Sequence, residues 1–359
     1  MKLSVRIGIP PVTNMIDLTN SEEIKKLDPK NVYGSTEMFP NQCEQIWNEE
    51  IMLDDNYKSM QNIVLCGMGG SAYGGYIAQS LFKDGLSVPI YSNNDYTLPF
   101  FTNEKSLIVL SSYSGETEEV LACGEEAKSK NFKITGITTG GKLSEFFKSN
   151  NYTNLGFEPK FNPSGQPRLG TGYMILGFFV ILKKLGFINL GDDEFLKSVE
   201  ELKSSIPEIK NKSIFIAKSL VGYIPLVFCA EFLYGNAHIL RNQFNETSKS
   251  FSAFEDIPEL NHHLMEGLKN PPDKKMKIIF ITSDLYSGII KKRFELTKDV
   301  IGRNNVEFLE YKPQGSTKIS QVLNTLAFGG YTSLYLALLY GQDPSLIPWV
   351  DYFKEELGK

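Results

Sequence analysis

The stretch Ile63-Val-Leu-Cys66, which leads directly into Gly67-Met-Gly-Gly-Ser-Ala-Tyr-Gly-Gly75, decides the fold. Two further short runs, Leu107–Leu110 and Ile134–Thr138, also end in loops rich in glycine or hydroxyl residues. A helix-like segment follows each of the three loops. Short strands that are apolar on both faces and alternate with helices are typical of a parallel sheet built from βαβ units. This half of the chain therefore predicts an α/β fold.

The same pattern returns later in the chain, at Ile224–Phe228, Lys277–Ile281 and Val306–Leu309. The first two strands of each half are 107 − 63 = 44 and 277 − 224 = 53 residues apart. A repeated spacing favours two copies of one α/β unit over two unrelated α/β domains, which stay the alternative. With 359 residues, the chain is long enough for about two domains. We expect a lead-in with a helix over 1–50, a first domain over 51–190 and a second over 191–359.

Composition excludes several classes of partner. The 37 Lys and Arg against 42 Asp and Glu give a net charge of −5, which argues against nucleic acid and anionic membranes as partners.

Other sequence features concern the compartment. Four separated cysteines fit neither a zinc site nor a disulfide framework and indicate a reducing compartment. Arg6 and the prolines that follow argue against a signal peptide, and residues 319–342 read as a buried helix rather than a membrane span. We expect a cytoplasmic protein without a metal.

The first glycine-rich loop suits an anion, because glycines expose backbone N–H groups at the start of a helix. Gly67-x-Gly69-x-x-Ala72 also satisfies a loose dinucleotide fingerprint. That fingerprint expects an acid about 20 residues further on, and neither Asp84 nor Asp95 is well placed. The dinucleotide reading therefore rests on the glycines alone.

A second loop, Ser111-Ser-Tyr-Ser-Gly-Glu-Thr117, favours a phosphate instead. Its hydroxyl groups follow a strand and precede a helix, and Ser71 of the first loop can join them. The alternative is that Ser112 and Ser114 only cap the helix. The matching loop of the second half carries Asp284, which would repel an anion. We therefore expect one small phosphate monoester site, in the first half. Its candidate residues are Gly70, Ser71, Ser112, Ser114 and Thr117.

These two loops resemble the sugar-phosphate loops of sugar isomerase (SIS) domains. Further motifs make the chain similar to the bifunctional phosphoglucose/phosphomannose isomerase family over roughly residues 30 to 359. They are Gln166-Pro-Arg168 with Gly172-Tyr-Met, Gln243-Phe-Asn-Glu-Thr-Ser-Lys249, Pro258-Glu-Leu-Asn-His262, and Asp343-Pro with Phe353-Lys354. The resemblance implies two SIS-type domains, each a mainly parallel sheet flanked by helices. It also implies an enzyme of carbohydrate metabolism that interconverts glucose or mannose 6-phosphate with fructose 6-phosphate through a cis-enediol(ate), without a cofactor.

The resemblance also assigns roles. Glu246 matches the base that takes the proton between C1 and C2, and Arg168 matches an arginine that stabilises the developing oxyanion. His262 and Lys354 match the ring-opening pair, the histidine coming from the neighbouring subunit of a homodimer. Without the resemblance each would read as an ordinary surface or salt-bridge residue. Two positions depart from the family pattern: Glu116 replaces its usual asparagine and Tyr76 an acidic residue, which puts substrate preference in doubt.

Three other functions stay open. A ketose-phosphate aminotransferase on paired SIS domains needs a nitrogen source such as an N-terminal cysteine, which Met1-Lys2 does not offer. A non-catalytic sugar-phosphate sensor usually carries a DNA-binding or partner module, and the sequence shows no such segment. The hypothesis of a dinucleotide-dependent dehydrogenase is supported only by the glycine pattern of the first loop.

Overall fold

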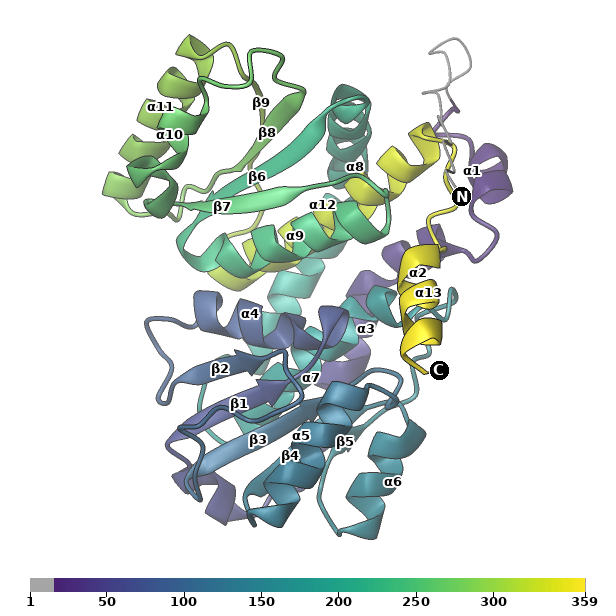
Figure 1. Ribbon diagram of the computed structural model, residues 1–359, viewed down its shortest axis with the longest axis vertical. Coiled ribbons are helices and arrows are strands. Elements are labelled where there is room, and N and C mark those ends of the chain that lie inside the picture. Colours follow the sequence, from purple (N-terminus) through teal and green to yellow (C-terminus); the bar gives the residue numbers. More distant parts are fainter. Residues whose placement is uncertain (1–15, 359) are drawn as a thin grey trace.

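The computed structural model describes residues 16–358, and Figure 1 shows them as two α/β units, one above the other. In each unit helices cover the faces of a sheet. The predicted absence of a signal peptide concerns residues 1–15, which lie outside the described part of the chain. Three short helices lead into the first unit: α1 (Ser21–Leu27), α2 (Val32–Glu37) and α3 (Phe39–Trp47).

The first sheet has five strands, and every neighbouring pair in it is parallel. Its spatial order is β2 (Ile90–Asn93), β1 (Asn62–Cys66), β3 (Ser106–Ser111), β4 (Lys133–Thr138) and β5 (Leu155–Gly156). The central strand β3 is buried along its whole length, as its apolar sequence predicts. The helices of this unit are α4 (Tyr73–Leu81), α5 (Glu118–Ser129), α6 (Gly141–Ser149) and α7 (Thr171–Lys184).

The second sheet has four parallel strands in the order β7 (Ala253–Ile257), β6 (Ile224–Ala230), β8 (Met276–Ile281) and β9 (Glu307–Tyr311). This order, second-first-third-fourth along the chain, is also the order of the first four strands in the other sheet. The shared strand order favours the prediction of two copies of one α/β unit over two unrelated domains. The helices of this unit are α8 (Asp192–Leu220), α9 (Tyr234–Glu246), α10 (Leu264–Gly267), α11 (Gly288–Arg303), α12 (Lys318–Leu339) and α13 (Pro348–Leu357).

Among the described residues, three strands and four helices were not anticipated from the sequence. Strand β7, Ala-Phe-Glu-Asp-Ile, has only one buried residue and therefore no continuous apolar run. Strands β2 and β5 are short, with four and two residues. The helices α1, α2, α10 and α13 also lack the buried apolar face that marks α12. The charged segment that opens the second half of the chain is a single 29-residue helix, α8, that continues through Pro207.

Helix α12 is the core of the second unit. It is long and apolar enough to cross a membrane by length and composition, but 94% of its most apolar window is buried inside the protein. It packs along α8, and Tyr311 of β9 stacks on Phe328 with ring centroids 3.6 Å apart. The helix predicted over 319–342 is therefore a buried core helix. The division at residue 190 stays a prediction, since one connected apolar core runs through both units.

Candidate active site

The two predicted phosphate loops lie side by side at the carboxyl ends of β1 and β3. Ser111 Oγ donates to the carbonyl oxygen of Ser71 at 2.7 Å, and Ser71 Oγ accepts from Tyr113 N at 3.1 Å. Parallel neighbouring strands end at the same edge of a sheet, so the loops that follow them meet. The structure thus brings Ser71 next to the serine-rich loop, as the sequence predicted.

The second loop is a tight hydroxyl-lined turn. Ser112 Oγ lies 2.7 Å from Thr117 Oγ1 and accepts from Gly115 N at 3.1 Å, while Ser114 Oγ accepts from Glu116 N at 3.3 Å. Gly115 has φ 74°, and a Cβ there would stand 1.9 Å from the carbonyl oxygen of Gly140, so only glycine fits. Thr117 directly precedes α5 but makes no capping hydrogen bond. Its hydroxyl is therefore not used as a helix cap.

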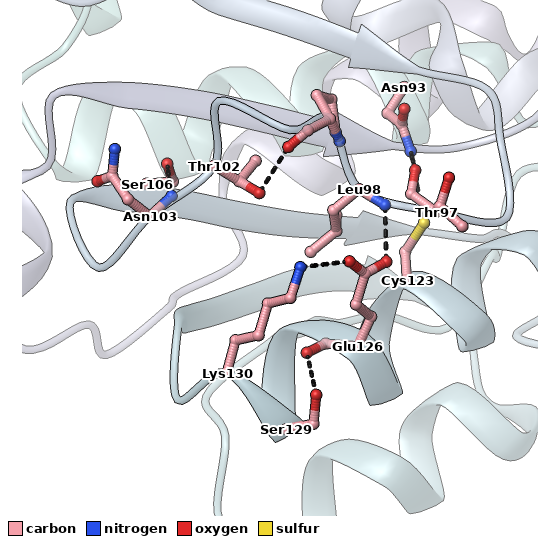
Figure 2. Close-up of polar contacts among 11 residues, drawn as sticks. Asn93, Thr97, Leu98, Thr102, Asn103, Ser106, Cys123, Glu126, Ser129 and Lys130 are labelled. Carbon is pink, nitrogen blue, oxygen red and sulfur yellow. Dashed lines mark hydrogen bonds and ion pairs between the residues drawn. The ribbon is translucent and has the colours of Figure 1, made fainter.

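Helix α5, which starts at this turn, is fixed from its other end. Glu126 accepts from Leu98 N at 2.8 Å and from Lys130 Nζ at 2.6 Å, and so joins α5 to the loop between β2 and β3 (Figure 2). In the same view the Asn93 amide donates to the carbonyl oxygen of Thr97 at 3.0 Å, and Cys123 lies beside it. These contacts set the direction in which the N-terminus of α5 points.

The two departures from the family pattern have structural partners. Glu116 accepts from Lys142 N at 3.0 Å and pairs with Lys142 Nζ at 3.2 Å, and these interactions lower the pKa of the carboxyl group. Its charge is thus directed to the start of α6. Tyr76 donates to Asn94 Oδ1 at 2.6 Å and stacks on His238, and Asn94 Nδ2 donates to Gly67 O at 2.6 Å. Tyr76 therefore braces the first loop.

Loss of one hydroxyl group from the predicted phosphate site, here called the cradle (Gly70, Ser71, Ser112, Ser114 and Thr117), should weaken the binding of a phosphorylated substrate. Ser112→Ala removes an oxygen that is held in the turn, and a hydrogen bond to a charged group contributes about 1.5–3 kcal/mol. We expect KM for a sugar phosphate to rise roughly tenfold or more with kcat nearly unchanged. Ser129→Ala, at the far end of α5, is the matched control. Steady-state kinetics on both variants check this. An unchanged KM in Ser112→Ala would contradict the prediction that Ser112 binds the phosphate.

Arg168 and Glu246 meet between the two units. Arg168 lies in the short 3₁₀ turn η4 (Pro167–Leu169), and its Cα is 3.4 Å from the place a Cβ on Gly70 would occupy. Glu246 is the last residue of α9. One small pocket is lined by Tyr73, Arg168 and Leu169 from the first unit and by Gln243, Glu246 and Thr247 from the second. The seam between the units therefore places a cation and a carboxylate beside the phosphate loops.

Burial changes the acid–base properties of this pair. Desolvation raises the pKa of Glu246, while the charges of Arg168 and Lys354 act in the opposite direction. Desolvation lowers the pKa of Arg168, and Glu246 opposes that shift. Arg168 Nε is buried and has no hydrogen-bond partner. A carboxylate with a raised pKa next to a fixed cation is suited to take a proton from carbon and to stabilise the resulting oxyanion.

The pH profile should follow the pKa of Glu246. The carboxylate must be ionised to act as a base, so kcat/KM falls as the pH drops through its raised pKa. Because Arg168 lowers that pKa, Arg168→Met should move the acid limb of the profile to higher pH. Arg168→Lys keeps a charge and should leave the limb near its wild-type position. If the limb of Arg168→Met stays at the wild-type pH, Glu246 is not the titrating group.

The structure places the remaining predicted residues apart from one another. Lys354 lies on the exposed helix α13, close enough for its charge to lower the pKa of Glu246. His262 ends the 3₁₀ turn η6 (Glu259–His262) after β7 and is exposed. His262 does not line the pocket that contains Arg168 and Glu246. Within one chain the site thus holds Arg168, Glu246 and Lys354, and His262 stands outside it.

Two residues of the seam were missed by sequence reasoning. Tyr73 is buried against Glu246 and Asn242, and its pKa is raised by burial and by the Glu246 charge. Tyr73 lies inside the glycine-rich loop, but from the sequence alone a tyrosine at this position indicates a buried core residue rather than a site residue. Lys249 closes the quoted Gln243–Lys249 motif, and burial lowers its pKa to about 8. The sequence motif includes Lys249. The carbonyl group of Asp343 that binds its ammonium group lies about 94 residues further along the chain, so the motif does not indicate the contact.

Residues 16–358 contain no group of three or more His, Cys, Asp or Glu side chains placed to hold a metal ion. Comparison with known proteins finds relatives over most of the chain. Residues 209–357 match the model of the bacterial phospho-glucose isomerase C-terminal SIS domain. A bifunctional phosphoglucose/phosphomannose isomerase of Aquifex aeolicus is 33% identical over 92% of this chain and 99% of its own. The chain belongs to the bifunctional phosphoglucose/phosphomannose isomerase family.

Other members and neighbours are consistent with this placement. The family's protein from Caldicellulosiruptor bescii is 30% identical over 91% of this chain and 99% of its own. The C-terminal domain of glucosamine-fructose-6-phosphate aminotransferase from Francisella tularensis superposes with a TM-score of 0.65 at 17% identity. That match covers 90% of this chain and 98% of that domain, and it confirms the expected paired SIS-type fold. The expected α/β class and the family resemblance are therefore both confirmed.

Proposed function

We propose that this protein interconverts glucose 6-phosphate and mannose 6-phosphate with fructose 6-phosphate through a cis-enediol(ate), without a metal or redox cofactor. The observation that carries the proposal is that Glu246 and Arg168 line one pocket beside the glycine-rich loop and the hydroxyl-rich loop. The loops hold the phosphate at one end of the sugar. Remote binding of this kind supplies energy that orients C1 and C2 for reaction.

The residues act in sequence on the bound sugar. Lys354 and a histidine open the ring by exchanging a proton between the ring oxygen and the anomeric hydroxyl. Glu246 then removes the proton from the carbon next to the carbonyl, the two electrons of that C–H bond form the C1=C2 bond, and the carbonyl oxygen becomes an enediolate. Arg168 stabilises that oxygen. A proton then moves from the neighbouring hydroxyl to the enediolate oxygen. Glu246 returns the abstracted proton to the other carbon as that neighbouring oxygen becomes the new carbonyl, which completes the conversion.

The test is a direct assay with fructose 6-phosphate as the only substrate and EDTA in the buffer. Formation of glucose 6-phosphate and mannose 6-phosphate, measured after quenching, is the expected result. Activity that disappears with EDTA contradicts the metal-independent chemistry. Absence of both products, with fructose 6-phosphate still bound in a titration, indicates a sugar-phosphate sensor instead. We also propose that the protein acts in the cytoplasm, in glycolysis or gluconeogenesis.

We also propose a homodimer in which His262 reaches the site of the second copy. His262 is exposed and does not line the Arg168–Glu246 pocket of its own chain, which supports this arrangement. A two-fold interface is self-complementary, so both copies would contribute equally.

Subunit mixing tests the shared site. Glu246→Gln and His262→Ala should each be nearly inactive alone. In their heterodimer one site regains an intact Glu246 and an intact His262, so a mixture that exchanges subunits should recover about one quarter of wild-type activity. A mixture that stays inactive despite verified exchange places His262 in its own chain's site or outside the mechanism. Native mass spectrometry of differently tagged subunits verifies the exchange. A mixture of Glu246→Gln with wild type is the activity control, because it should keep half of the wild-type activity whether or not the subunits exchange.

A further inference from the structure

Among the described residues, strand β7 has a strand neighbour on one side only. It forms the edge of the order β7-β6-β8-β9 and pairs with β6 through residues 253–257. Figure 1 shows β7 at the lower margin of the upper sheet. Its first four residues are half-buried, and only Ile257 is buried. The unpaired N–H and C=O groups of such an edge are a template for pairing with a strand of another chain.

The segment that leads into β7 exposes an apolar side chain beside the candidate active site. Phe251 is 72% exposed. It lines a surface pocket together with Arg241 and Glu246. The Arg241 guanidinium lies 5.3 Å from the ring centroid of Phe254, and its buried Nε has no hydrogen-bond partner among the described residues. This surface therefore offers a second protein an apolar group, a cation with a free donor and the proposed catalytic carboxylate.

The order of elements around β7 indicates which partner fits this edge. Glu246 ends α9 shortly before β7, and the turn η6 with His262 starts two residues after β7 ends. In an antiparallel pair of strands, the end of one strand lies beside the start of the other. A second copy that pairs its β7 antiparallel would therefore bring its η6 turn to the segment between α9 and β7. Glu246 lies at the start of that segment, and His262 does not line the Glu246 pocket of its own chain.

The sequence of β7 selects one register for this pairing. A two-fold axis places one residue directly opposite its own copy, and the central positions of the strand are Phe254, Glu255 and Asp256. Like charges directly opposite one another destabilise a strand pair, whereas an aromatic pair stabilises it. Glu255 or Asp256 on the axis is therefore unfavourable. With Phe254 on the axis, the exposed Phe251 lies opposite Ile257 of the second copy, each three positions away from the axis.

We propose that β7 pairs antiparallel with the β7 of a second copy, with Phe254 on the two-fold axis, and so brings His262 of each chain to Glu246 of the other. This interface rests on the homodimer of the proposed function and specifies the surface through which that dimer forms. The two sheets join into one continuous sheet across the axis. Both copies contribute the same groups, so both sites are completed in the same way.

Disulfide cross-linking tests the register. Directly opposite Cα atoms in an antiparallel pair are about 4.5–5.5 Å apart, which is within the reach of a disulfide. Phe254→Cys should therefore form a covalent dimer on mild oxidation with diamide, and a reductant should reverse it. Glu255→Cys and Asp256→Cys are the matched controls, because their copies lie two and four positions out of register. The four native cysteines are buried, so the wild-type protein should not cross-link.

Charge substitutions on the axis test the pairing without added cysteines. Phe254→Lys and Phe254→Glu each place like charges opposite one another, so each variant should dimerise roughly tenfold or more weakly in analytical ultracentrifugation. An equimolar mixture of the two places opposite charges on the axis and should regain the dimer. Phe215→Glu, at an exposed aromatic position of α8, is the matched control and should stay dimeric. Thermal unfolding of each variant verifies that its subunit is folded.

The outcomes separate the interface from the proposed chemistry. A monomeric wild type, a dimer that persists in both charge variants, or a mixture that stays monomeric overturns the β7 interface. Cross-linking at 255 or 256 that matches that at 254, or cross-linking at none of the three positions, also overturns it.

The isomerase assay tests the delivery of His262. Phe254→Lys should lose roughly tenfold or more in kcat, and its mixture with Phe254→Glu should recover the loss. A monomeric Phe254→Lys with wild-type kcat overturns the transfer of His262 between chains. If the wild-type protein shows no isomerase activity, the proposed reaction fails, while sedimentation and cross-linking still decide the interface.

Discussion

Glu246→Gln should reduce kcat for the conversion of fructose 6-phosphate by about 10²–10⁴-fold, the usual contribution of a positioned acid–base group. The amide has almost the same shape as the carboxylate but does not accept a proton from carbon. The phosphate loops are separate from Glu246, so KM should change little. Steady-state kinetics measure both quantities. A wild-type kcat in this variant would remove Glu246 from the mechanism.

The stability of Glu246→Gln distinguishes lost chemistry from lost folding. The folded-state pKa of Glu246 is raised above its ordinary value of 4.5, so its protonated form is favoured by folding. That contribution is present below the ordinary pKa and is lost as the pH rises through the raised one. At neutral pH the ionised side chain therefore costs stability, and a neutral amide should not lower Tm by more than a few degrees. Glu200→Gln, on the exposed side of α8, is the control for both measurements.

Sequence alone predicts the parts of this fold that have a strong local signal. The strands β1, β3 and β8 are buried over nearly all their residues, and their apolar runs are visible without any alignment. Strand β7 is paired with β6 in the sheet but is mostly half-exposed, so its sequence lacks the apolar signal. A strand that depends on a partner far along the chain for its definition is the kind that a local pattern misses.

In the candidate site, too, the sequence predicts what has a local signal and misses what depends on contacts between distant residues. The hydroxyl residues of the second loop lie within a few positions of one another, and the structure gathers them in one hydrogen-bonded turn, as their clustering predicts. Phosphate binding at this turn stays a prediction. Glu246 and Arg168 are 78 positions apart (246 − 168), and only the packing of the two units brings them to one pocket. Their roles were accessible through the family resemblance and not through spacing. The contact of Lys249 with the carbonyl oxygen of Asp343 belongs to the same category.

Removal of residues 354–359 should abolish most of the activity and leave the protein folded. Lys354 is the ring-opening group in the proposed reaction, and its loss also removes a charge that lowers the pKa of Glu246. No residue of α13 is buried, so the truncation exposes no core and Tm should hardly change. We expect kcat to fall by roughly 10²-fold or more. The matched control removes only residues 355–359 and keeps Lys354, and it should retain far more activity.

An open-chain substrate separates ring opening from proton transfer at carbon. An aldotetrose 4-phosphate has no free hydroxyl in position to close a five- or six-membered ring, so it does not need Lys354 for that step. Exchange of its C2 proton with solvent, followed by NMR, should therefore persist in the 354–359 truncation and vanish in Glu246→Gln. Loss of this exchange in the truncation, with Tm unchanged, would place Lys354 in the enolisation itself. Normal turnover of fructose 6-phosphate by the truncated protein would exclude Lys354 from the reaction altogether.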